Sequence, residues 1–94
     1  MVVGSLEITL QAPWVHSLKE KRMIVRSLVA KIRNKFNVSV HEVDEMDSHQ
    51  TIVLGITTGS NSQIQIQKVL DFVINFIEED YDLITEDIII DFFK

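Results

Sequence analysis

The chain of 94 residues has no cysteine, one proline and three glycines, and it has no long apolar run. The lack of cysteine excludes disulfides, thiolate zinc sites and a cysteine nucleophile. No apolar stretch approaches the about 20 residues of a membrane span, and the first residues lack the basic and then apolar pattern of a signal peptide. These absences predict a reduced, cytoplasmic protein with no membrane association. About 100 residues is the usual length of one domain, so we expect a single domain over residues 1–94.

Basic residues are few and are concentrated in one segment. The chain has 9 Lys and Arg against 14 Asp and Glu, which gives a formal net charge of −5. Residues 16–36 nevertheless carry a net charge of +6, and the rest of the chain carries −11. Residues 69–93 include eight acids and no base. The sequence therefore predicts one basic element within an otherwise acidic domain.

Apolar periodicity predicts four strands and two helices. Leu6, Ile8 and Leu10 alternate with polar residues, as in a strand with one buried face. Ser17 and Glu20 have the spacing of a capping box and mark the start of the first helix. The same kind of pattern predicts strands over residues 6–11, 38–43, 52–56 and 88–93, and helices over residues 18–36 and 66–80.

The order strand-helix-strand-strand-helix-strand is typical of an α+β ferredoxin-like fold. We expect a four-stranded antiparallel sheet with both helices on one face. The other, open face of the sheet is predicted to hold Glu7, Thr9, His41, Gly55, Thr57, Ile89, Asp91 and Phe93. An RNA-recognition module of this topology carries aromatic residues on its first and third strands, and this chain has none there. That way of binding RNA is therefore not expected, whereas Ile89 and Phe93 offer apolar surface to a partner.

The first predicted helix is basic along one flank. At 100° per residue, all three arginines and one lysine fall within about 60° of one another. Guanidinium groups suit phosphates because their planar fork donates two hydrogen bonds at once. The residues predicted to bind RNA are Lys19, Lys21, Arg22, Arg26 and Arg33. A solvated helix face and a contact with the acidic region of another copy are the alternatives.

Two other parts of the chain carry residues of interest. The segment between the second and third predicted strands holds His41, Glu42, Asp44, Glu45, Asp47 and His49. Their spacing matches no established metal-ligand signature, so a solvated turn is favoured over a metal site. Trp14, next to Pro13, is expected to anchor the core or an edge. The sequence has no nucleophile motif and no glycine-rich phosphate loop, so we expect no enzymatic activity and no cofactor.

Several short segments form a recognisable set. They are residues 17–22 (SLKEKR), residues 33–40 (RNKFNVSV), Glu42-Val43-Asp44, Asp47, Gln50, Leu54-Gly55 and residues 76–79 (FIEE). Together they resemble the YlxP-like proteins, a bacterial domain of unknown function, over nearly the whole chain. The resemblance implies a ferredoxin-like fold and, because genes of this family commonly neighbour those for translation initiation and ribosome maturation, a role linked to RNA. The family's hairpin usually has Trp before the Gln and Arg after it, where this chain has His49 and Thr51.

The basic flank and the resemblance together predict a small non-enzymatic binding protein. Its expected partner is ribosomal RNA or a ribosome-assembly intermediate. The alternative is a protein-interaction or homodimerisation module that uses the open sheet face at Ile89 and Phe93 and binds no nucleic acid. In neither case do we expect a small-molecule substrate.

Overall fold

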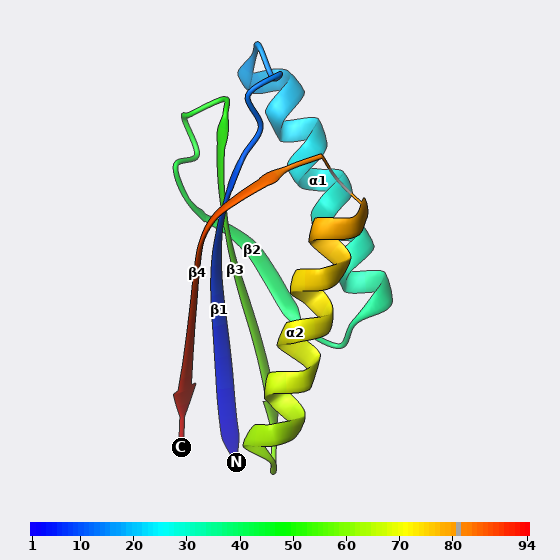
Figure 1. The fold of residues 1–94 in the computed structure, drawn as a ribbon, viewed down its shortest axis with the longest axis vertical. Coiled ribbons are helices and arrows are strands. Elements are labelled where there is room, and N and C mark those ends of the chain that lie inside the picture. The colour runs from blue at the N-terminus through cyan, green and yellow to red at the C-terminus, as the bar shows by residue number, and fades with distance from the viewer. Residues whose placement is uncertain (81) are drawn as a thin grey trace.

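The structure, a computed structural model, describes residues 1–80 and 82–94. In these residues the elements are β1 (Val2–Gln11), α1 (Leu18–Lys35), β2 (Ser39–Asp44), β3 (Thr51–Ser60), α2 (Gln63–Asp80) and β4 (Ile84–Phe93). The strands form one antiparallel sheet in the order β2-β3-β1-β4. Both helices lie on the same side of the sheet (Figure 1). The predicted ferredoxin-like α+β fold is therefore confirmed.

The start of α1 follows from the predicted capping box. The Ser17 hydroxyl accepts a hydrogen bond from the Glu20 amide at 3.1 Å, and the Glu20 carboxylate accepts one from the His16 amide at 3.3 Å. The first contact satisfies an amide of the first turn that has no partner within the helix, whereas the Glu20 carboxylate reaches the residue before the N-cap and not, as the capping box had predicted, Ser17 itself. The helix ends at Lys35, and Phe36 is extended at its C-terminus. The capping box thus fixes where the basic segment begins.

The core lies between the helices and one face of the sheet. Alternate residues of β1 and β3 are buried there, together with the apolar stripes of α1 and α2. Gly4 of β1 is needed for this packing, because a Cβ at this position would collide with Cγ2 of Ile66 in α2. The close approach of α2 to β1 therefore depends on a missing side chain.

The register of the sheet places the predicted residues on its open face. Glu7 of β1 lies between Gly55 of β3 and Ile89 of β4, and His41 of β2 lies opposite Gly55. A Cβ on Gly55 would lie only 2.7 Å from Cγ1 of Val43 in β2, so Val43 packs against the backbone of Gly55. The pleat makes these residues share one face, away from both helices.

Strand β4 occupies an edge of the sheet. Six of its ten residues are apolar, which is typical of a strand buried on both faces, yet none of the ten is buried. The reason is its position, because β4 is an edge strand that pairs with β1 on one side only (Figure 1). In the part of the chain that the structure describes, no helix is long and apolar enough to cross a membrane.

Candidate nucleic-acid interface

One flank of α1 carries four exposed cations, which we call the basic flank: Lys19, Arg22, Arg26 and Arg33. The guanidinium of Arg33 donates a hydrogen bond to the Val40 carbonyl of β2 at 3.0 Å. This contact shows that the basic flank runs along the β2 side of α1. Lys19, Arg22 and Arg26 make no ion pair with any described residue. Their charges are therefore available to a partner.

The cations elsewhere on α1 are engaged within the molecule. On the opposite flank, the Lys35 ammonium lies 4.9 Å from the centre of the Phe76 ring. Phe76 itself packs edge-on against Phe36, with ring centres 5.7 Å apart. Lys31 also makes an intramolecular interaction. Three of the four cations of the basic flank, Lys19, Arg22 and Arg26, thus differ from the other cations of α1 because their side chains make no ion pair, hydrogen bond or ring contact with a described residue.

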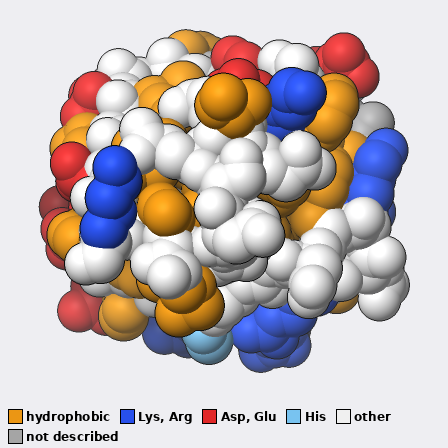
Figure 2. Space-filling model, turned by 90° about the horizontal axis from the view of Figure 1, so that it is seen from below, with side chains coloured by type: hydrophobic (Ala, Val, Ile, Leu, Met, Phe, Trp, Pro, Cys, Tyr) orange, Lys and Arg blue, Asp and Glu red, His pale blue; other side chains and the backbone are white. Residues whose placement is uncertain are grey.

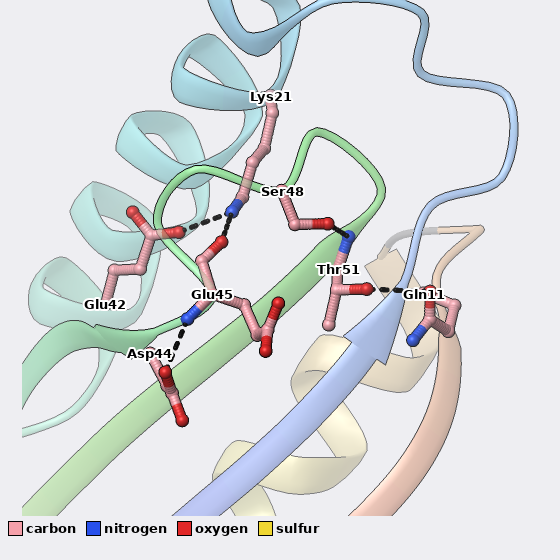
Figure 3. Close-up of polar contacts among 7 residues, drawn as sticks. All are labelled: Gln11, Lys21, Glu42, Asp44, Glu45, Ser48 and Thr51. Carbon is pink, nitrogen blue, oxygen red and sulfur yellow. Dashed lines mark hydrogen bonds and ion pairs between the residues drawn. The ribbon is translucent and has the colours of Figure 1, made fainter.

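Lys21 does not belong to the interface, so its predicted RNA contact is wrong. Its side chain is only 1% exposed, and its ammonium lies 2.8 Å from Oε2 of Glu42. The same ammonium donates a hydrogen bond to the Glu45 carbonyl at 2.6 Å (Figure 3). Lys21 is buried because it precedes Val25 by four residues and Leu28 by seven, which places it on the apolar side of α1. That spacing was visible in the sequence.

We call the contact of Lys21 with Glu42 and Glu45 the lysine clamp, and it joins α1 to the loop between β2 and β3. Oε2 of Glu42 is itself buried, and it makes no aligned hydrogen bond within the described residues, so the ammonium is what balances its charge. Glu45 has a left-handed backbone, with φ of 54°, which is uncommon for a residue with a Cβ. Asp44 accepts a hydrogen bond from the Glu45 amide at 2.8 Å. The clamp and Asp44 together hold this turn.

A second set of contacts fixes the same loop to the segment before α1. The Gln50 side chain donates hydrogen bonds to the carbonyls of Pro13 and Val15, at 3.0 and 3.2 Å. The Gln50 carbonyl accepts one from the Ala12 amide at 2.8 Å. Four of the residues that carried the family resemblance therefore make internal contacts: Lys21, Glu42, Asp44 and Gln50.

The histidines and carboxylates of this hairpin do not converge. Nε2 of His41 lies 3.2 Å from the Ser39 hydroxyl, on the open face of the sheet. Glu42 points to the opposite face, toward α1. Among residues 1–80 and 82–94, no three His, Asp or Glu side chains come together as ligands for a metal ion. The arrangement is that of separate polar contacts.

The open face of the sheet is acidic. A hollow of about 630 Å³ at its hairpin end is lined by Glu7, Thr9, Gln11, Asp44, Glu45, Thr51, Val53, Glu86 and Asp87. None of these lining residues is basic. Seen from the end that holds both termini, the largest group of basic side chains lies along the lower margin, and smaller basic groups lie near acidic ones at the left and upper right (Figure 2). The carboxylates that line this hollow make the open face unsuited to phosphate.

Trp14 is not a core residue, so of the two predicted roles, an anchor of the core or of an edge, the first is wrong. Its side chain is 41% exposed, in the loop between β1 and α1. Val15, its neighbour, is fully buried in its place. Sequence patterns do not separate these two residues, because the loop has no periodicity. The exposed indole lies a few residues before the basic flank in the chain.

Comparison with known proteins agrees with this architecture. A family model described as "Protein of unknown function (DUF503)" matches residues 3–89. The chain belongs to this family. It is also 40% identical over 62 residues to the "Uncharacterized protein YlxP" of Bacillus subtilis (strain 168), which covers 66% of this chain and 67% of that protein. The resemblance to YlxP-like proteins is therefore confirmed. The part matched by the DUF503 family includes all of α1 and the lysine clamp, and it ends within β4.

Proposed function

We propose that this protein is a non-enzymatic module that binds the phosphate backbone of RNA through the basic flank of α1. The observation that carries the proposal is the presence of three exposed cations that make no ion pair with any described residue, Lys19, Arg22 and Arg26, in a chain with a formal net charge of −5. In an acidic protein, unpaired carboxylates are plentiful. Cations that stay unpaired on one flank therefore favour an external anion as their partner.

The shape of the basic flank supports an extended polyanion over a small anion. From Lys19 to Arg33 the flank runs along 14 residues, or about 21 Å of helix axis. This length spans several successive phosphates of a nucleic-acid strand. Arg33 keeps further guanidinium donors beyond the one used for Val40. The side chains would position the protein on a backbone without reading bases.

Several features favour RNA bound by its backbone over RNA read by the sheet. β1 and β3 carry no aromatic side chain on which a base would stack. The open face is acidic and would repel phosphates. Ribosomal RNA is the first partner to test, since the family resemblance links this domain to ribosome maturation. The proposal places the protein in the cytoplasm.

Binding is expected to be weak and dependent on salt. Three or four phosphate contacts give a slope of log K against log salt of about −2 to −4. The net charge of −5 opposes tight binding, so a higher affinity is expected only within a larger assembly. Titration of labelled ribosomal RNA fragments by fluorescence anisotropy, at several salt concentrations, measures both quantities.

The deciding variant is the double substitution Arg22→Ala with Arg26→Ala. We expect it to reduce RNA affinity and to make the salt slope shallower by about 1.4 to 1.8, because two phosphate contacts are lost. The matched control is Lys68→Glu, which changes the net charge by the same amount at an exposed position outside α1. Equal losses in both variants would mean that only net charge matters, and the proposal would then be wrong. The single exposed tryptophan, Trp14, gives a second signal of binding near α1.

A further inference from the structure

Strand β4 exposes several large apolar side chains to solvent. Its exposed apolar residues are Ile84, Ile88, Ile89 and Phe93, and the last two are 47% and 57% exposed. Ile90 and Phe92 are only partly buried. The exposed residues lie on both faces of the strand, so the apolar surface wraps around the edge of the sheet. A patch of this kind on a small protein is typical of an interaction surface.

The outer edge of β4 is also free to form hydrogen bonds. Within the described residues β4 pairs with β1 on one side, and its other side has no neighbouring strand. Edge strands are usually protected by proline, by lysine or by being short. The last seven residues of β4, Asp87–Phe93, contain no proline, lysine or bulge, and their two charged residues, Asp87 and Asp91, lie on the open face of the sheet. The backbone of this segment therefore offers a template for another strand.

The regular part of β4 has its centre at Ile90. A bulge at Glu86 interrupts the pairing with β1, and residues Asp87–Phe93 then pair without a break with Val3–Thr9. A second copy of β4 placed antiparallel, with a twofold axis at Ile90, pairs with this whole segment. Ile88 then lies opposite Phe92 of the second copy, and Ile90 lies opposite its own equivalent. On the helix side of the sheet, apolar residues thus meet apolar residues.

Charge favours the same register. With the axis at Ile90, Asp91 lies opposite Ile89 of the second copy and Asp87 lies opposite Phe93. An axis one residue earlier would place Asp87 opposite Asp91, and one residue later would place Asp91 opposite itself. The axis at Ile90 also brings Lys94 next to Glu86 of the second copy. This is the register in which the one base near β4 meets an acid and no carboxylates face each other.

We propose that two copies of this chain associate through their β4 edges, with the twofold axis at Ile90, to form a continuous eight-stranded sheet. This interface differs from the predicted contact between open faces. Face-to-face stacking would bring Glu7, Asp87 and Asp91 of each copy against those of the other. In the edge-to-edge pair the carboxylates stay in water, and both helix layers lie on the same side of the sheet.

Sedimentation of the wild-type chain, from micromolar to several hundred micromolar, tests the association. We expect twice the monomer mass at the upper concentrations. Lys94→Glu is expected to weaken the dimer about two- to fivefold, because an exposed ion pair becomes a repulsion. A wild-type chain that remains monomeric over this range overturns the proposal.

Cross-linking tests the register, and the absence of native cysteine makes it specific. Ile90→Cys places two thiols opposite each other at a Cα separation of about 4.5 or 5.5 Å, both within the range of a disulfide. Ile84→Cys is the control, since it is an exposed position on the same strand whose two copies would lie about 40 Å apart. In a glutathione buffer we expect Ile90→Cys to form dimers about tenfold faster or more, because pairing raises the effective thiol concentration. Equal rates for the two variants contradict the register.

Discussion

Replacing Lys21 by methionine should destabilise the protein and leave its RNA affinity unchanged. The lysine clamp places a buried ammonium 2.8 Å from Glu42 and 2.6 Å from the Glu45 carbonyl. Methionine keeps the length of the side chain and removes the charge. Glu42 then retains a partly buried carboxylate with no counter-charge, which is the costly consequence of breaking such a pair. The Glu45 carbonyl also loses its hydrogen-bond donor.

The expected loss can be worked from the burial of the two groups. Breaking a fully buried ion pair costs about 3–5 kcal/mol. The Lys21 side chain is 1% exposed, but that of Glu42 is 20% exposed, so water relieves part of the penalty. We expect the free energy of unfolding to fall by about 2–3 kcal/mol. With an m-value of about 1 kcal/mol/M for a domain of this size, the urea midpoint falls by about 2–3 M.

Urea unfolding followed by circular dichroism measures this change. The control is Lys19→Met, an exposed lysine on the same turn of α1, for which we expect a change within about 0.5 kcal/mol. The double variant Lys21→Met with Glu42→Leu should regain most of the stability, because an apolar pair replaces the ion pair. Our interpretation of the clamp is refuted if Lys21→Met is as stable as Lys19→Met. It is also refuted if Lys21→Met lowers the free energy of unfolding by the same amount in the Glu42→Leu background as in the wild type. RNA binding by folded Lys21→Met should match the wild type.

Two further substitutions test the contacts that shape the fold. Ser17→Ala removes the N-cap hydroxyl of α1 and should lower the free energy of unfolding by about 1 kcal/mol. Ser27→Ala, at an exposed position within α1, is the control and should be neutral or slightly stabilising. Equal thermal midpoints for the two variants would contradict the capping role of Ser17. Gly4→Ala places a methyl group against Ile66 and should cost about 1–3 kcal/mol. In the control Gly59→Ala the new Cβ lies 3.5 Å from its nearest neighbouring atom, so the loss of stability should be smaller. Equal stability of the two variants would show that α2 shifts freely over β1.

The elements of this fold could be predicted because their signals are local. The capping box at Ser17 and the apolar stripes of the helices depend on residues within a few positions of one another. The position of β4 could not be inferred in this way. Its apolar residues on both faces suggest a covered strand, and only the long-range pairing with β1 leaves it at an edge.

The basic flank was predictable for a similar reason, since helical geometry alone brings Lys19, Arg22 and Arg26 together. The error at Lys21 shows the limit. Its place on the apolar side of α1 was visible in the sequence, but its counter-ion Glu42 lies 21 residues away and meets it only after β2 has paired with β3. The acidic hollow likewise combines residues of all four strands and depends on their register.

The separation of charge has a consequence for the approach to a partner. The cations of the basic flank lie on the helix side of the sheet and the acidic hollow lies on its open face, so a polyanion attracts the first region and repels the second. The field of a polyanion therefore exerts a torque on the protein before any contact forms, so encounters begin with α1 in front. Added salt should therefore slow association more than it speeds dissociation. The open face would then point into solvent at every productive encounter.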